Sequence, residues 1–265
     1  MSERPHGWLR RLAIAAAIAV PLIPVVIALT LNSAGAPARA TTSASHFAPA
    51  ATPTPRVPAR PSLRLPGGSG TLVALVVHRT QMRSRPGGHV VAGVPLRTPF
   101  GSPDAMWVRR TAGRWLGVVS QSVGNNRLGW IPASAAALSR VDWEVRVSLE
   151  ARQLTVVENG RSVKHYRVAV GAPGSPTPTG RFAVTDRLNT GDPAGPYGCC
   201  ILALSAVAPH AIQGWSGGNR IAIHSTPETS TIGEAVSHGC VRLTLAQGRW
   251  LLTHIPLGTP TLISS

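Results

Sequence analysis

A cysteine and a histidine near the C-terminus combine the residue types of an activated nucleophile. Cys240 lies in the stretch Ser237-His238-Gly239-Cys240-Val241-Arg242, and His224 ends the run Ile221-Ala222-Ile223-His224. A cysteine attacks as its thiolate, and an unperturbed thiol has a pKa of about 8.5. A nearby imidazole that accepts the proton makes the nucleophile available near neutral pH. Gly239 suits a sharp turn that exposes the sulfur and lets backbone N–H groups face a developing oxyanion.

The two histidines are not equivalent. His224 closes an apolar run and is predicted to lie at the end of a strand, whereas His238 sits in the cysteine's own loop, so His224 is the better candidate for the base. A zinc site made by His224, His238 and Cys240 is an alternative. The chain has no close C-x-x-C or H-E-x-x-H pair, which disfavours zinc, and we expect no metal and no other cofactor.

The order of these motifs resembles the L,D-transpeptidases (YkuD-domain enzymes) that remodel bacterial peptidoglycan. Residues 145–160 are similar to the opening hairpin of that domain, with Asn159-Gly160 at a predicted turn. Residues 168–182 resemble its Val-Gly…Thr-Pro-x-Gly-x-Phe segment, followed by the histidine and cysteine motifs in the family's order. The resemblance implies a β-rich catalytic domain over residues 142–265.

The resemblance also implies roles at the reacting centre. Cys240 would be the nucleophile, and His224 the general base and acid. Ser225 would orient the imidazole through its backbone carbonyl, and the backbone N–H groups of Gly239 and Cys240 would form the oxyanion hole.

Further residues matching the family would shape the substrate site. Ser237 and His238 would shape the loop. Arg242 would hold the turn or meet a carboxylate, in a position where many members have Asn and others Arg. Tyr197 would line the pocket for the donor peptide or serve in packing.

The implied reaction is a two-step acyl transfer on peptidoglycan stem peptides. Cys240 would attack the carbonyl before the terminal D-alanine of a donor tetrapeptide, release D-alanine and leave a thioester. An acceptor amine from another stem would then form a 3→3 cross-link, whereas water would make the enzyme a carboxypeptidase. Family members are generally sensitive to carbapenems, so these should acylate Cys240.

Two other readings of the sequence remain open. A papain-like or amidase-type hydrolase would use the same chemistry, but there the cysteine usually precedes the histidine. A non-enzymatic wall-binding protein is the other alternative, because the basic charge lies upstream of the catalytic half. Residues 1–140 carry 16 Arg against two acidic residues, whereas residues 141–265 are nearly balanced. Such a surface attracts anionic polymers, including nucleic acid, anionic lipid and wall polymer.

The N-terminal sequence indicates which of these partners the chain would meet. Residues 12–31 are almost wholly apolar, and at about 1.5 Å per residue they could cross a hydrocarbon core of about 30 Å. Arg4, Arg10 and Arg11 precede this run, so the rest of the chain is predicted to be exported. We expect a single-pass anchor, or a cleaved signal after Ala38-Arg39-Ala40, with the enzyme at the outer face of the membrane or secreted into the wall. Nucleic acid is therefore not an expected partner.

Two further segments are predicted before the catalytic domain. Residues 32–70 are rich in Pro, Ala and Thr, which favours a disordered linker. Residues 71–140 contain short β-branched and aromatic runs separated by Gly, Pro and Asn. The segments 115–118 and 129–132 resemble SH3-like barrels of bacterial wall proteins. The expected fold class is therefore mainly β: an anchor, a linker, an SH3-like unit and the catalytic domain.

Few helices are expected, and the cysteines are too few for a disulfide framework. Residues 245–252, with Thr244 as a possible N-cap, and residues 233–236 are predicted to be helical. Cys199 and Cys200 are expected to stay unpaired, because side chains of consecutive strand residues point to opposite faces. A bridge from either one to Cys240 would silence the nucleophile.

Overall fold

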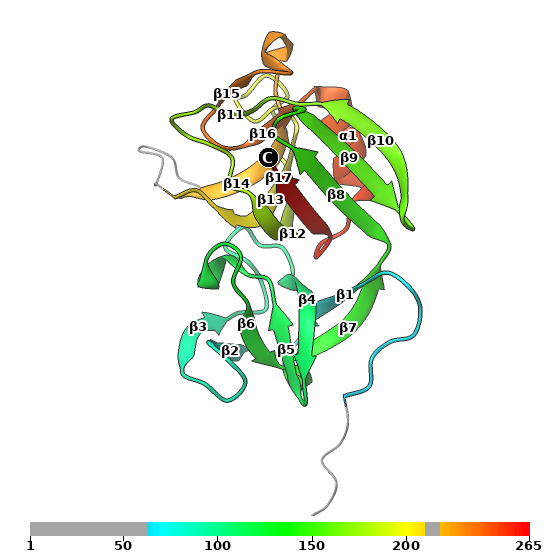
Figure 1. Cartoon of the computed structure of the whole chain (residues 1–265), viewed down its shortest axis with the longest axis vertical. Coiled ribbons are helices and arrows are strands. Elements are labelled where there is room, and N and C mark those ends of the chain that lie inside the picture. The colour runs from blue at the N-terminus through cyan, green and yellow to red at the C-terminus, as the bar shows by residue number, and fades with distance from the viewer. Residues whose placement is uncertain (1–62, 210–217) are drawn as a thin grey trace, which may run out of the picture. The chain divides into compact units, whose positions relative to one another are not determined.

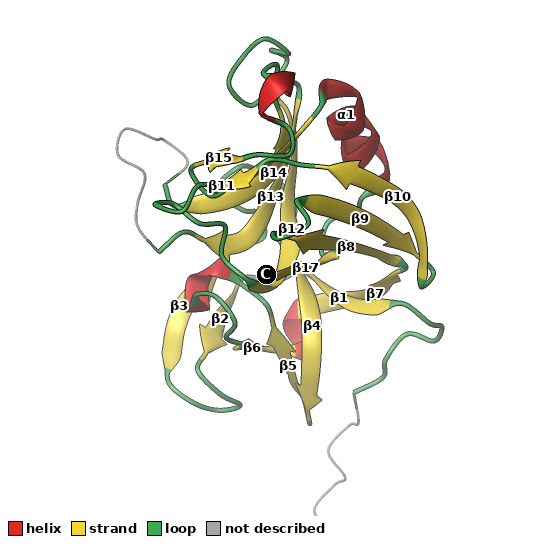
Figure 2. Ribbon diagram, turned by 45° about the horizontal axis from the view of Figure 1, so that its top comes forward, coloured by secondary structure: helices red, strands yellow, loops and turns green. Residues whose placement is uncertain are grey.

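The computed structural model describes residues 63–209 and 218–265, in which the regular structure is mainly strands, with one α-helix and three short 3-10 helices (Figures 1 and 2). The candidate anchor and most of the linker lie outside these residues. In the part of the chain that is described, no helix has the length and apolar character of a membrane span. Both large sheets belong to one unit, residues 58–265.

The first sheet contains seven strands in the order β3-β2-β6-β5-β4-β1-β7. Every pairing in it is antiparallel, and the short β-branched and aromatic runs expected within residues 71–140 contribute its strands. Its likeness to SH3-like units stays a prediction. The strands are β1 (Thr71–Val76), β2 (Thr80–Arg83), β3 (Val90–Val94), β4 (Ala105–Ala112), β5 (Trp115–Val118), β6 (Gly129–Pro132) and β7 (Ala136–Val141).

The second sheet contains eight strands in the order β10-β9-β8-β17-β12-β13-β14-β16. Two of its pairings are parallel, β8 with β17 and β14 with β16. The strands are β8 (Trp143–Ser148), β9 (Gln153–Glu158), β10 (Arg161–Arg167), β12 (Gly180–Asn189), β13 (Cys200–Val207), β14 (Arg220–Ser225), β16 (Val241–Leu243) and β17 (Pro260–Ser264). A separate pair joins β11 (Val170–Gly171) to β15 (Ala235–Ser237).

The opening hairpin of this sheet agrees with the sequence. Strands β8 and β9 pair antiparallel, and Asn159 and Gly160 adopt φ angles of 49° and 77° between β9 and β10. Two successive residues at positive φ are the signature of a type I′ turn, whose twist matches that of the strands. The predicted turn is confirmed.

One of the two predicted helices exists. Helix α1 (Leu245–His254) begins at Thr244, whose side chain accepts a hydrogen bond from the Gln247 N–H in a capping box. The other prediction was wrong: residues 233–236 include a glycine at φ +95° and lead into β15, where Ala235 pairs with Val170. A partner 65 positions away in the chain overrides the local helical tendency.

Each large sheet has its own apolar core, and polar contacts join the two sheets. Leu116, Ile131 and Met82 are fully buried in the first core, and Phe182 and Leu204 in the second. Across the junction, the Asn125 side chain exchanges two hydrogen bonds with the backbone of Val207, at 2.8 and 2.9 Å. The Asn126 side chain likewise bonds the backbone of Thr179 and of Arg181. Strand β12, which Asn126 contacts, lies two strands from β14.

Candidate active site

The pairing of β14 with β16 brings the predicted base and nucleophile together. The two strands are parallel, with Ile223 opposite Val241 and His224 opposite Arg242. Cys240 directly precedes β16 and receives a hydrogen bond from the backbone of Ala222. Because alternate residues of a strand point to the same face, the side chains of His224 and Cys240 lie on one face of the sheet. Both are buried, with 3% and 6% of their surface exposed.

His224 is held by the residue that follows it. Its Nδ1 lies 2.8 Å from the carbonyl oxygen of Ser225, which can only accept, so Nδ1 carries the proton and Nε2 is left as the acceptor. Burial lowers the pKa of His224 to about 4, although the hydrogen bond to Ser225 opposes this change. The imidazole is therefore neutral at neutral pH and can act as a base.

The thiol of Cys240 is also uncharged in the resting state. Burial raises its pKa, and the hydrogen bond from Ala222 and the charge of Arg242 oppose the increase. The sequence suggested a thiolate available near neutral pH, but it gave no measure of burial. Both groups are therefore neutral in the resting state, with the thiol and the imidazole on the same face of the sheet.

The turn that carries Cys240 is closed by Ser237. The Ser237 hydroxyl donates to the Cys240 carbonyl at 2.6 Å and accepts from the Gly239 N–H at 3.1 Å. Gly239 has a φ of +109°, and a Cβ there would lie 2.9 Å from Cδ1 of Ile221. Glycine is therefore required at this position. The Gly239 amide, expected to face the oxyanion, is directed to Ser237 in this structure, while the side chain of His238 is exposed.

Arg242 places a positive charge beside the pair. Its backbone bonds Ala169 in both directions at 2.9 Å, which fixes β16 between β14 and the residue before β11. Its guanidinium lowers the pKa of both His224 and Cys240, and its buried Nε has no hydrogen-bond partner among the described residues. A half-buried guanidinium with an unused donor is suited to an anionic ligand.

Tyr197 forms another wall of the site. Its ring meets the His224 ring edge-on, with centroids 5.0 Å apart. Burial and the neighbouring Cys240 raise the pKa of the Tyr197 phenol to about 12, against the effect of Arg242. The structure thus brings Tyr197, His224, Cys240 and Arg242 together.

Cys199 and Cys200 form a disulfide with each other, which corrects the expectation that they stay unpaired. The alternation argument assumed that both belong to a strand, but β13 begins at Cys200 and leaves Cys199 free of that constraint. Cys240 is the remaining free cysteine, so no bridge blocks it. The sequence signal for this pairing is the adjacency of the two cysteines after Gly198.

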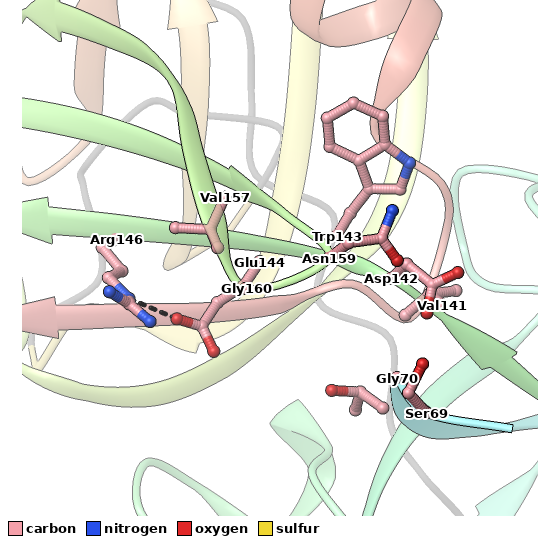
Figure 3. A pocket seen from close by; sticks show the side chains of 11 residues that line it. Ser69, Gly70, Val141, Asp142, Trp143, Glu144, Arg146, Val157, Asn159 and Gly160 are labelled. Carbon is pink, nitrogen blue, oxygen red and sulfur yellow. Dashed lines mark hydrogen bonds and ion pairs between the residues drawn. The ribbon is translucent and has the colours of Figure 1, made fainter.

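The nucleophile does not line either of two cavities in the described residues. One, of about 350 Å³, lies where β7 gives way to β8 and is lined by Ser69, Gly70, Thr71, Val141, Asp142, Trp143, Glu144, Arg146, Val157, Asn159 and Gly160 (Figure 3). Arg146 bonds Glu144 there. The other, of about 490 Å³, borders the disulfide and is lined by Asn189, Gly191, Pro193, Cys199, Cys200, Arg249, Leu252 and Thr253.

Sequence comparisons match this half of the chain to known proteins. Residues 142–263 match the family model of the L,D-transpeptidase catalytic domain, YkuD. The chain is 34% identical over 119 residues to a putative L,D-transpeptidase YkuD of Bacillus licheniformis, covering 45% of this chain and 64% of that protein. The Bacillus subtilis protein of the same name is 33% identical over 124 residues, which cover 47% of this chain and 67% of that protein.

A mycobacterial relative is matched over a smaller share of its length. L,D-transpeptidase 1 of Mycobacterium tuberculosis is 30% identical over 124 residues, 43% of this chain and 47% of that protein. The chain thus spans about half to two thirds of these relatives. Among solved structures, L,D-transpeptidase 3 from Mycobacterium tuberculosis, in complex with a faropenem-derived adduct, superposes with a TM-score of 0.37 at 21% identity, over 52% of this chain and 73% of that chain. An overlay at this score adds nothing to the sequence matches.

Proposed function

Because this chain belongs to the YkuD family of L,D-transpeptidases, we propose that it cross-links peptidoglycan stem peptides through a thioester on Cys240. The observation that carries the proposal is the pairing of β14 with β16. It sets the free thiol and a neutral, oriented imidazole on one buried face.

In the first step the donor peptide acylates Cys240. As the sulfur attacks the carbonyl before the terminal D-alanine of a tetrapeptide, Nε2 of His224 accepts the thiol proton. The C–N bond then breaks, and the imidazolium returns that proton to the amine of the departing D-alanine. Proton transfer during attack removes the need for a resting thiolate, which burial disfavours.

Backbone and side-chain donors stabilise the charges of this step. The N–H groups of Cys240 and Gly239 are the proposed oxyanion donors, and Gly239 would exchange its bond to Ser237 for the substrate oxygen. Arg242, with its unused Nε, binds the carboxylate of the D-alanine. Tyr197 packs along the donor peptide next to His224.

The second step decides the product. The side-chain amine of the third residue of another stem attacks the thioester carbonyl and gives its proton to His224. The C–S bond then breaks, the Cys240 sulfur takes that proton back, and the 3→3 cross-link is released. Water in place of the amine gives a tripeptide, so the same site would act as a carboxypeptidase. A carbapenem presents a strained acyl group to the same sulfur and acylates Cys240.

We place this reaction outside the cytoplasmic membrane, with the chain anchored by residues 12–31 or released into the wall. The first sheet supports contact with anionic wall polymer. Arg109 and Arg110 are exposed on β4. Burial, and then the nearby charges of Arg181 and Arg110, lower the pKa of Arg109, so the three positive charges lie close together.

The products of the full chain with a disaccharide-tetrapeptide, read by mass spectrometry, test the proposal. A dimer that has lost one D-alanine is the result expected of a transpeptidase, and a tripeptide would indicate a carboxypeptidase. Cys240→Ala should abolish both products while the chain unfolds at an unchanged temperature. Turnover by the Cys240→Ala variant would exclude the mechanism, and wall binding without any turnover by the unmodified chain would favour a purely wall-binding protein.

A further inference from the structure

The disulfide between Cys199 and Cys200 borders the residue that orients His224. In the pairing of β13 with β14, Ile201 lies opposite His224. One step along the two antiparallel strands, Cys200 therefore faces Ser225. The Cys200 N–H donates to the Ser225 hydroxyl at 3.1 Å, and Sγ of Cys199 lies 3.5 Å from the same oxygen. A disulfide sulfur has no proton, so the hydroxyl is the partner that can donate in this contact.

Ser225 joins this ring to the base. Its hydroxyl also reaches the carbonyl of Tyr197 at 3.3 Å, while its own carbonyl accepts from Nδ1 of His224 at 2.8 Å. One residue therefore contacts the disulfide with its side chain and selects the tautomer of the imidazole with its backbone. Tyr197, two residues before Cys199, packs edge-on against the same imidazole.

There is no free space around Ser225 to absorb a change. The residue is fully buried, and a Cβ at Gly198 would lie 2.5 Å from its Oγ. From the other side, a Cβ on Gly248 of α1 would lie 2.8 Å from Cβ of Ser225 and 3.3 Å from Cβ of Cys200. Close packing of this kind transmits a displacement of the sulfur atoms to Ser225.

The disulfide is buried, with 6% of Cys199 and 3% of Cys200 exposed, but a cavity borders it. Both cysteines line the cavity of about 490 Å³ between β12, the loop that follows it and α1. The exposed Arg249 also lines this cavity, and its charge attracts the thiolate form of a reductant, which is the form that attacks disulfides.

We propose that the Cys199–Cys200 disulfide is a redox-sensitive positioning element that holds His224, through Ser225, in the geometry the Cys240 reaction requires. A dithiol reduces it by attack of one thiolate on a cysteine sulfur and release of the other cysteine. The second thiol of the reductant then displaces the first cysteine and closes the disulfide of the reductant. The protein disulfide has thereby gained two electrons and two protons and become two thiols. The new S–H groups no longer form a ring and compete as donors beside Ser225. The proposal uses the base role of His224 proposed above, but not the transpeptidase reaction.

The test measures Cys240 itself and needs no peptidoglycan substrate. The full chain is kept oxidised or reduced with dithiothreitol, freed of the reagent without air and reacted with iodoacetamide between pH 5 and 9. Mass spectrometry of the peptide that contains Cys240 gives the rate at this thiol alone. We expect the alkylation rate at pH 7 to fall about tenfold on reduction and its pH profile to move to higher pH. A general base contributes roughly 100-fold or more to a rate, and a misplaced base should lose part of that contribution.

Two variants separate positioning from a general structural effect. Cys199→Ala with Cys200→Ala should react like the reduced chain and ignore dithiothreitol. Ser225→Ala keeps the carbonyl that His224 uses but removes the hydroxyl, so it should slow Cys240 and reduce the effect of dithiothreitol.

An unchanged rate and pH profile in a chain whose mass shows the reduced pair would overturn the proposal. So would a disulfide that resists the dithiol, or an equal response to dithiothreitol in the double alanine variant. Failure to find cross-linking activity would count against the proposed function only. The disulfide proposal is judged by the alkylation rates of Cys240.

Discussion

At the scale of single residues, the reacting pair is defined by burial. His224 and Cys240 are nearly inaccessible, and burial disfavours the charged form of each. The imidazole therefore stays unprotonated far below its ordinary pKa of 6.5. The raised pKa keeps the Cys240 thiol protonated, which protects the sulfur from oxidation, since oxidants react with the thiolate.

This gives a pH dependence with a definite sign. A base whose pKa is lowered to about 4 is available above that pH, so activity should be lost as the pH falls through about 4, not 6.5. Turnover of tetrapeptide stems, expressed as kcat/KM between pH 3.5 and 8, measures this limb. His224→Gln should lower kcat/KM by about 100-fold or more above pH 5, and the difference should shrink below pH 4, where the unmodified chain has itself lost the base. The exposed His165→Gln is the control, and a limb near 6.5 in the unmodified chain would contradict the prediction.

At the scale of elements, α1 both closes the core and supports the site. Its residue Gly248 faces Ser225 and Cys200, at distances that leave no room for a methyl group. An alanine within a helix normally stabilises it by about 1 kcal/mol relative to glycine. Here the added Cβ must displace Ser225, and with it the carbonyl that holds His224.

We therefore expect Gly248→Ala to lower both the stability of the folded chain and the reactivity of Cys240, although alanine has the higher helix propensity. Ala246→Gly, an exposed position of the same helix, is the matched control. It should cost about 1 kcal/mol in urea unfolding but leave the alkylation rate of Cys240 unchanged. A Gly248→Ala chain that is more stable and equally reactive would show that Ser225 does not depend on this contact.

The elements also show what sequence reasoning could reach. The Asn-Gly pair predicted the turn between β9 and β10, and a capping pattern predicted the start of α1, because these signals are local. The candidate nucleophile, base and carbonyl came from a motif. Residues 233–236 and the disulfide were missed, because β15 depends on a distant partner and because the start of β13 decides whether Cys199 can reach Cys200. The neutral state of the pair depends on burial, which no local pattern contains.

At the scale of the whole molecule, charged side chains are buried where the two sheets meet. Asp186 of β12 is fully buried and accepts hydrogen bonds from Thr98 and Thr185. Arg220, the first residue of β14, lies 3.6 Å from Asp186 and bonds Thr185. Strand β14, which carries His224 near its C-terminal end, is therefore held at its N-terminal end by contacts beside the first sheet. Removing residues 71–140 would strip Thr98 from this network, so wall binding has to be tested by substitution.

Neutralising the cluster of Arg109, Arg110 and Arg181 should weaken binding to the wall. We expect Arg109→Gln with Arg110→Gln to reduce the amount of chain that sediments with isolated sacculi at low salt. The difference should fade as salt rises beyond about 0.15 M, where the screening length is about 8 Å. Arg161→Gln with Arg167→Gln, exposed on β10, is a control of equal charge. Equal losses for both pairs would indicate net charge, and not this cluster, as the cause.

Asp104 makes the junction between the sheets sensitive to pH. Burial, and then the neighbouring carboxylate of Asp186, raise its pKa from 3.8 to about 6, against the attraction of Arg220. The folded state therefore holds this proton more strongly than the unfolded state does. The contribution to stability is fully present below pH 3.8 and is lost as the pH rises through about 6. A change of about two pKa units corresponds to roughly 3 kcal/mol.

Asp104→Asn removes this dependence, because an amide stays neutral. The variant should be more stable than the unmodified chain at pH 8, by up to about 3 kcal/mol, and nearly equal to it at pH 4. Urea unfolding at both pH values measures the difference. Asp142→Asn, which removes an exposed carboxylate, controls for the loss of one negative charge. An equal change in stability at pH 4 and pH 8 for Asp104→Asn would contradict the prediction, because it would mean that the Asp104 carboxyl does not titrate between these pH values.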